Sequence, residues 1–351
     1  MFSLDDYDYI LPEKLIAQQP VATRDESRLL VLDRSGRKIA HRNFYEIERL
    51  LEPSDVLVLN NTKVIPGRLQ GHKDSGGKVE ILILDYAANP EQATDPHERV
   101  YQCLVKASKP PKSGTRLRFE ENLTAEVLNG QKGIYKIRFH CETDFENLLK
   151  RIGHMPLPPY IRRDGAEIQD HTSYQTVYAH YPGAIAAPTA GLHFTPRLLD
   201  RLQAKEITIV YITLHVGYGT FLPVRVTDIR DHTMHAEWFS ISSETANSIN
   251  TAKADGRRVV AVGTTCVRTL EHTTNPDCLI SPGTGACDLY IYPGYQFKTV
   301  DAMLTNFHLP KSTLLMLVSA FAGRKEILNA YQAAIKEQYR FYSYGDAMLI
   351  L

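Results

Sequence analysis

The sequence LHVGYGTFLPV occupies residues 214–224 and follows the segment ITIVYIT at 207–213. Segment 207–213 is rich in β-branched and aromatic residues, which predicts a strand. The proline near the end of segment 214–224 would stop the hydrogen-bonding ladder of that strand. His215 therefore lies at the end of a predicted buried strand, and Gly217 and Gly219 would let the backbone approach a ligand. Two interpretations are open: a tight turn closed by a histidine, or part of a ligand site at the end of a sheet.

Three other predicted strands also end in polar, loop-forming residues. Strand 55–59 leads to Asn60, Asn61 and Thr62, strand 257–262 to Gly263, Thr264 and Thr265, and strand-like 297–305 to Asn306, Phe307 and His308. Ligands gather at the carboxyl ends of strands in open α/β sheets, so we expect the four loops to face one crevice. Ordinary capping and turn chemistry is the alternative for each loop taken alone.

Two of the predicted helices start in loops that could bind an anion. The glycine-threonine turn at 263–265 opens directly into a helix, and the segment PTAGLHFT at 188–195 leads into another one. The first amides of a helix have no partner within it, so either start could hold a carboxylate or a phosphate.

Residues 63–151 differ in character from the flanking chain. They form several short predicted strands with turn signals and no helix between them, which is typical of a small β-barrel. Mixed α/β patterns lie on both sides. We therefore expect an α/β fold in which residues 1–62 and 152–351 form a large discontinuous α/β domain that carries a smaller inserted barrel domain, 63–151. The polar segments 89–98 and 275–287 are expected to be peripheral loops.

Composition narrows the class of protein. The chain of 351 residues is 43% hydrophobic, and no apolar run approaches the length of a membrane span. The N-terminus lacks the basic and apolar regions of a signal peptide, and five cysteines without a CxxC pair fit reduced thiols. We therefore expect a cytoplasmic protein with no membrane contact. Forty basic and forty acidic residues give no net charge, which argues against binding of nucleic acid through the overall charge of the protein.

A local basic run interrupts that balance. Residues 99–118 carry no acid, and they include Lys106, Lys109, Lys112 and Arg116. A nucleic-acid contact and a merely solvated face are equally good explanations. Other chemistries have weaker support: His232, His235 and Glu237 stand close together, but without a helical HExxH they make a poor zinc motif. The sequence contains no GxSxG elbow, Walker A loop or GxGxxG turn.

Motifs along nearly the whole chain carry a resemblance to a known family. They are QQP (18–20), RDxSRLL (24–30), LNNTKVIP (59–66), PTAGLHFT (188–195), HVGYGTF (215–221), MHxE (234–237), VGTTxxRTLE (262–271), TNFHLPxST (305–313) and FYSYGDAM (341–348). In this order they resemble the S-adenosylmethionine:tRNA ribosyltransferase-isomerases of queuosine biosynthesis. The resemblance implies a large α/β domain with an inserted β-barrel, as expected above.

The resemblance also implies the reaction. Such transferases move the ribosyl group of S-adenosylmethionine onto 7-aminomethyl-7-deazaguanine at the wobble position of a tRNA and isomerise it. The products are epoxyqueuosine-tRNA, adenine and methionine. S-adenosylmethionine is then a consumed co-substrate, with no other cofactor and no metal, and the partner is a tRNA carrying the deazaguanine in its anticodon. We expect a monomer. A tRNA-binding protein without catalysis and an ordinary methyltransferase are the rival interpretations.

The same resemblance suggests roles for residues of this chain. The general base and acid would come from His193, His215, Glu237 and His308, without an assignment of which is which. Arg268 with the amides of Thr264 and Thr265 could hold the methionine carboxylate. Asn60, Asn61 and Asn306 could bind base edges or hydroxyls, and Tyr218, Phe221 and Tyr344 could stack on a base. Further substrate-binding candidates are Thr62, Arg68, Thr189, Gly191, Gly217, Gly219 and Thr220. Candidates for tRNA phosphates are Lys106, Lys109, Lys112, Arg116, Arg162 and Arg163.

Overall fold

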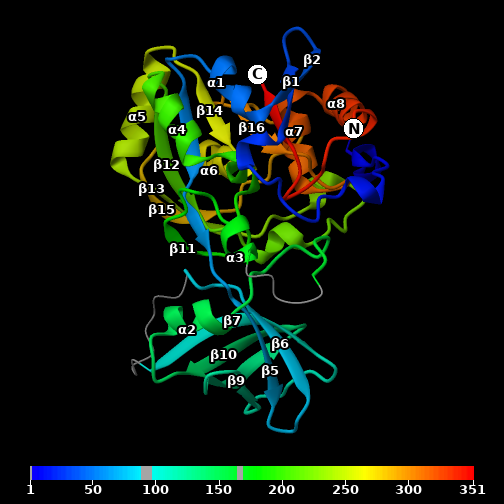
Figure 1. Cartoon of the computed structure of the whole chain (residues 1–351), viewed down its shortest axis with the longest axis vertical. Coiled ribbons are helices and arrows are strands. Elements are labelled where there is room, and N and C mark those ends of the chain that lie inside the picture. The colour runs from blue at the N-terminus through cyan, green and yellow to red at the C-terminus, as the bar shows by residue number, and fades with distance from the viewer. Residues whose placement is uncertain (1, 88–96, 164–168) are drawn as a thin grey trace.

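The computed structural model describes residues 2–87, 97–163 and 169–351, so most of the segment 89–98 lies outside the described residues. A nine-stranded sheet in the order β15-β13-β12-β3-β14-β16-β17-β1-β2 forms its larger part (Figure 1). The strands are β1 (Arg28–Asp33), β2 (Lys38–Asn43), β3 (Val56–Asn60), β12 (Thr208–Leu214), β13 (Glu237–Ile241), β14 (Val259–Val262), β15 (Gly283–Cys287), β16 (Ala302–Asn306) and β17 (Ala347–Ile350). Strands β12, β3, β14 and β16 run parallel to one another, and β17 and β1 run parallel to each other but antiparallel to those four. Strands β13, β15 and β2 pair antiparallel at the two edges.

The central strands are apolar throughout because both faces of the sheet are covered. In β3, Val56 and Val58 belong to one hydrophobic core, whereas Leu57 and Leu59 belong to the other. The first core is covered by α5 (Ser243–Ala254), α6 (Thr264–Thr273), α7 (Thr313–Ala322) and α8 (Arg324–Lys336). The second is covered by α1 (Ile47–Leu50) and α4 (Pro196–Ala204). This three-layer arrangement explains the continuous apolar runs.

A closed six-stranded barrel forms the smaller part, at the lower end of the molecule in Figure 1. Its strands are β5 (Arg68–Lys73), β6 (Lys78–Ile83), β7 (Glu98–Ala107), β8 (Arg116–Arg118), β9 (Thr124–Gln131) and β10 (Ile134–His140), all paired antiparallel. The helix α2 (Phe145–Ile152) packs Phe145, Leu148 and Leu149 into the barrel core. The predicted α/β fold with a β-barrel is confirmed; the exact domain boundaries remain our proposal.

Some predicted elements were wrong. The expected loop 275–287 contains β15, whose sequence GTGAC has little strand propensity but pairs with the open edge of β13. Residues 290–293 form no strand, since their side chains pack on the core without a ladder partner. The loop 154–192 contains α3 (Asp170–Ser173) and β11 (Tyr181–Ala184), which pairs parallel with β4 (Thr62–Val64).

Candidate functional site

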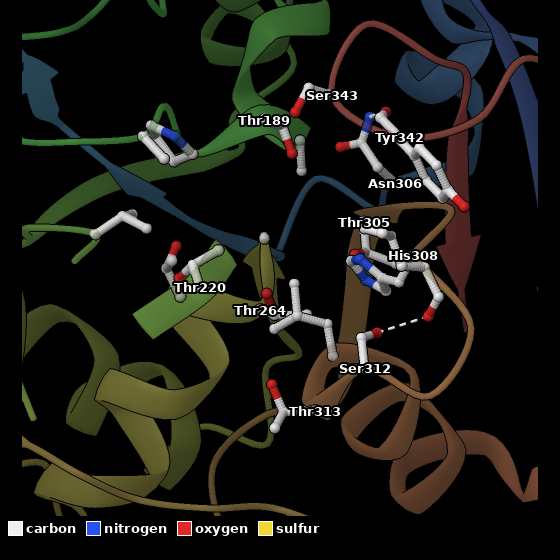
Figure 2. A pocket seen from close by; sticks show the side chains of 18 of the residues that line it. Thr189, Thr220, Thr264, Thr305, Asn306, His308, Ser312, Thr313, Tyr342 and Ser343 are labelled. Atoms are coloured by element: carbon white, nitrogen blue, oxygen red, sulfur yellow. Dashed lines mark hydrogen bonds between the residues drawn. The ribbon is translucent and has the colours of Figure 1, made fainter. Parts of the chain in front are cut away.

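A cavity of about 340 Å³ lies at the carboxyl ends of β12, β14 and β16. Its walls include residues from 186–190, 216–224, 263–265, 305–314 and 342–343, together with Pro159, Tyr160, Tyr174, Glu237 and Arg268. Figure 2 shows Thr189, Asn306 and Ser343 gathered on one side of the cavity, whereas Thr220 and Thr264 lie on another. Three of the four polar strand ends and the loop at 188–190 therefore meet in one place.

The polar residues at the fourth strand end, that of β3, make structural hydrogen bonds and do not line the cavity. The Asn60 amide donates to the Leu214 carbonyl at 3.0 Å and to the Thr265 hydroxyl at 3.3 Å, and its oxygen accepts from the backbone N–H groups of Leu214 and Thr62. The Asn61 oxygen accepts from the Thr213 hydroxyl at 2.7 Å. These bonds clamp β3 to β12 and α6, so Asn60, Asn61 and Thr62 shape the cavity from outside its walls.

His215 also lies outside the walls. Its Nδ1 is 2.7 Å from the Thr62 hydroxyl, and its ring stacks on Trp238 with 5.0 Å between centroids. Gly183 has to be a glycine because a Cβ there would come within 2.8 Å of the imidazole. Val216, the next residue along, does line the cavity. Neighbouring residues of an extended segment point to opposite sides, so His215 faces away from the space that its loop encloses.

Glu237 and Arg268 form a buried ion pair in the cavity wall, each side chain 5% exposed. The Glu237 carboxylate also accepts from the Gly217 N–H at 2.8 Å and lies 3.5 Å from the Thr220 hydroxyl. The Arg268 guanidinium donates further to the carbonyls of Leu289 and Cys287. The pair therefore fixes the loop 217–221, and Arg268 is already neutralised, which weakens its expected role as a carboxylate ligand.

The buried histidines do not titrate near neutral pH. Burial lowers the pKa of His193 to about 3, that of His308 to about 3 and that of His215 to about 4. The argument that histidine serves here because it titrates near pH 7 was therefore wrong: all three rings are neutral at that pH. Of the three, only His308 is in the cavity wall, where its Nε2 is 2.8 Å from the Thr305 hydroxyl.

The N-terminus of α6 opens into the cavity without a side-chain cap. Its N-cap residue is Gly263, with φ +88°, a backbone conformation that favours glycine. By contrast, the Ser312 hydroxyl caps α7 by accepting from the Leu315 N–H at 3.2 Å. The first N–H groups of α6 and the positive end of its dipole therefore face the cavity, as expected for an anion site at Thr264 and Thr265.

Tyr344 lies elsewhere. Its hydroxyl donates to Asp170 at 3.0 Å, and Asp170 pairs with Arg163 at 2.8 Å. Arg163 also lines the second hollow described below, but its guanidinium is nearly buried and already neutralised by Asp170, which weakens its expected role as a phosphate ligand. Gly191 is buried under Tyr178, whose hydroxyl lies 2.0 Å from where a Cβ would be. The Phe221 side chain lies outside the described residues.

A second hollow, of about 850 Å³, separates the barrel from the segment 154–171. Arg68 and Lys106 line it from the barrel and Tyr218 from the large domain. Lys106, Lys109, Lys112 and Arg116 are exposed and have no ion-pair partner within the described ranges. Arg162, by contrast, pairs with Glu13 at 2.7 Å on the surface. The basic run is therefore available to an anionic partner.

The described part of the chain holds no cluster of three or more His, Cys, Asp or Glu side chains suited to a metal ion. None of the described helices is long and apolar enough to span a membrane. All five cysteines are free thiols.

The sequence prediction missed several cavity residues. Tyr342 and Ser343 line the cavity, although Tyr344 was the residue chosen from that motif. Tyr342 has φ +71°, so the chain reverses there and directs neighbouring side chains to different sides. Ser27, which bonds His193, was also missed. The only sequence signal for these residues was that they belong to motifs of the family resemblance.

The fold and the cavity define a protein with an α/β sheet, an inserted barrel and a small-molecule site at the ends of parallel strands. A family model described as queuosine biosynthesis protein matches residues 4–350. S-adenosylmethionine:tRNA ribosyltransferase-isomerases from Trichlorobacter lovleyi and Moorella thermoacetica are 50% and 51% identical, each alignment covering 99% of both chains. The crystal structure of S-adenosylmethionine tRNA ribosyltransferase from Thermotoga maritima matches with 38% identity and a TM-score of 0.55, over 99% of this chain and 100% of that one. The chain belongs to the queuosine biosynthesis protein family.

Proposed function

We propose that this chain is an S-adenosylmethionine:tRNA ribosyltransferase-isomerase. It would transfer and isomerise the ribosyl group of S-adenosylmethionine onto 7-aminomethyl-7-deazaguanine at the wobble position of a tRNA, releasing adenine and methionine. The observation that carries the proposal is the full-length match to relatives of that name at about half identity. The cavity adds support, since it joins apolar walls with a few polar groups, as small-molecule sites do.

S-adenosylmethionine is assigned to the cavity at the strand ends. The uncapped start of α6 suits the methionine carboxylate, and the apolar walls suit the adenosine part. Of the four acid–base candidates, His308 and Glu237 are in the wall, while His193 and His215 are not. His308 is neutral at pH 7 and so cannot act as an imidazolium acid. The same burial makes it a weak base, so its role toward the carbon beside the sulfonium would depend on its position in the cavity wall.

The tRNA is assigned to the hollow between the barrel and the large domain. Arg68 and Lys106 would face its phosphates, and the basic run at 106–116 would extend that contact over the barrel. The Tyr218 ring stacks on no other ring of the described residues and lines this hollow, so it could stack on the extruded base. The loop 217–222 contributes to both hollows and would separate the two substrates.

Both hollows are lined by one chain, so we propose a monomer as the working unit, acting in the cytoplasm, where thiols stay reduced. No metal or further cofactor is needed for the roles assigned above.

One assay tests the proposal. The protein is incubated with S-adenosylmethionine and a tRNA that carries 7-aminomethyl-7-deazaguanine, and the small products are separated. Free adenine and methionine are expected. Release of S-adenosylhomocysteine would indicate methyl transfer instead, and binding without any small product would indicate a tRNA-binding protein. His308→Gln should retain S-adenosylmethionine but release little adenine, whereas Arg42→Gln, on the exposed face of β2, should behave like the parent.

A further inference from the structure

Asn306, the last residue of β16, holds a buried acceptor to which none of the described residues donates. Its side chain lines the cavity and is 2% exposed. Its Oδ1 has no hydrogen-bond partner among the described residues. Buried polar atoms in native proteins are almost always paired, so an orphan in the wall of a cavity indicates a place where a ligand donates.

The orientation of this amide is fixed by its neighbours. Its Nδ2 lies 3.2 Å from the Tyr342 carbonyl, which can only accept. The nitrogen must therefore be on that side, and Oδ1 must be on the side of the cavity. A flipped amide would place two oxygens against each other, so the Tyr342 carbonyl excludes it.

His193 also fixes the position of the same nitrogen, Nδ2 of Asn306. Its Nε2 lies 3.3 Å from Asn306 Nδ2, and its Nδ1 lies 2.7 Å from the Ser27 hydroxyl. Ser27 donates its own proton to the Arg24 carbonyl at 3.2 Å, so the Ser27 oxygen accepts from the Nδ1–H of His193. This leaves a lone pair on Nε2 to accept from Asn306. The ring is held by stacking on Phe44, with 5.0 Å between centroids.

Two hydroxyls lie on the same side of the cavity as the Asn306 amide. Figure 2 shows Thr189 and Ser343 beside it. Three side-chain oxygens on this side suit a group with three donors. The uncapped start of α6, which suits a carboxylate, directly follows β14, the strand that pairs with β16 and so lies next to Asn306. An α-amino acid carries those two groups, an ammonium and a carboxylate, on one carbon.

We propose that Asn306 recognises the α-ammonium group of the methionine part of S-adenosylmethionine, with His193 and Ser27 as positioning residues that keep Oδ1 turned toward it. This rests on the proposed function in that it takes S-adenosylmethionine as the occupant of the cavity. It differs from the sequence-based expectation for His193, because the ring then moves no proton and acts only through Asn306.

The first test compares two ligands. Isothermal titration measures the binding of S-adenosylhomocysteine and of its analogue without the α-amino group to the parent and to Asn306→Ala. The parent should prefer the amine by about ten- to a hundredfold, the range for a hydrogen bond to a charged group. Asn306→Ala should bind both ligands equally. If Asn306→Ala kept the full preference, the assignment would be wrong. If the parent bound neither S-adenosylmethionine nor these ligands, the proposed function itself would fail instead.

The second test separates positioning from catalysis at His193. His193→Gln keeps an acceptor for Asn306, whereas His193→Leu removes it. We expect His193→Leu to raise the KM for S-adenosylmethionine about tenfold, with kcat within a fewfold of the parent and an unchanged pH profile, and His193→Gln to restore most of the KM. A loss of kcat by orders of magnitude in both variants, with normal unfolding midpoints, would show that His193 is a catalytic residue and overturn the proposal.

Discussion

Removing the guanidinium of Arg268 should destabilise the large domain and loosen the loop between the two hollows. Arg268→Met keeps much of the side-chain volume but leaves the Glu237 carboxylate buried without its counter-ion. Breaking one side of a buried pair costs about 3–5 kcal/mol, because the remaining charge stays out of water. The carbonyls of Leu289 and Cys287 also lose a donor each, so the upper part of that range is expected.

The chain contains its own probe for this experiment. Trp238 is the single tryptophan, lies next to Glu237 on β13 and stacks on His215. Urea unfolding followed by its fluorescence therefore reports on the large domain rather than the barrel. Arg162→Gln is a matched control: it breaks the exposed pair with Glu13 in the large domain and should change stability by no more than about 0.5 kcal/mol.

A double-mutant cycle then isolates the pair itself. Glu237→Gln alone should also destabilise, because it leaves the Arg268 cation buried. The double variant should lose less than the sum of the two single changes, by roughly 2–3 kcal/mol, since neither charge remains. Additive losses, or an Arg268→Met protein within about 1 kcal/mol of the parent, would refute the argument that this pair anchors the loop through Gly217.

Three further outcomes follow from the structure. Three buried histidines have a lowered pKa: His193, His215 and His308. The unfolded chain protonates these histidines below pH 6.5, whereas the folded chain does so only near pH 3–4. Their contribution to the free energy of unfolding is therefore full above pH 6.5. By pH 5 it should fall by about 2 kcal/mol per histidine, which urea unfolding midpoints would report. Gly191→Ala should lower the unfolding temperature because its Cβ meets the Tyr178 hydroxyl, and adding Tyr178→Phe should restore part of the loss; no rescue would contradict the clash. Lys106→Ala should raise the KM for tRNA severalfold and reduce the salt dependence of tRNA binding, while the affinity for S-adenosylmethionine stays unchanged. An unchanged salt dependence would show that Lys106 does not contact the tRNA.

Much of the large sheet could be predicted from its sequence because the signals there are local. Continuous apolar runs such as 56–59 have to be buried on both faces, and the polar residues after each run mark where the strand ends. The change to short strands without helices also predicted the barrel. By contrast, β15 forms only because the edge of β13 is open to it, and such a long-range partner leaves no mark in the sequence GTGAC.

The candidate site was harder to predict because it depends on which way individual side chains point. Within the motif at 341–348, Tyr342 and Ser343 line the cavity while Tyr344 bonds Asp170 outside it. The positive φ of Tyr342 produces this division. A motif identifies the segment that matters, but a single unusual dihedral angle decides which of its aromatic rings lines the cavity.

The loop at 214–224 shows the same limit at the end of a strand. Its last strand residue, Leu214, pairs with Phe239 of β13, and that register decides the side on which every following residue lies. Val216 and Thr220 therefore reach the cavity, whereas His215 turns to Thr62 and Trp238. His308 follows the irregular end of β16, where no alternation applies, and its ring does enter the cavity wall. The same residue type at two strand ends thus occupies different positions: His215 fixes the backbone beside the cavity, and His308 is the imidazole in the wall of the cavity that we propose for S-adenosylmethionine.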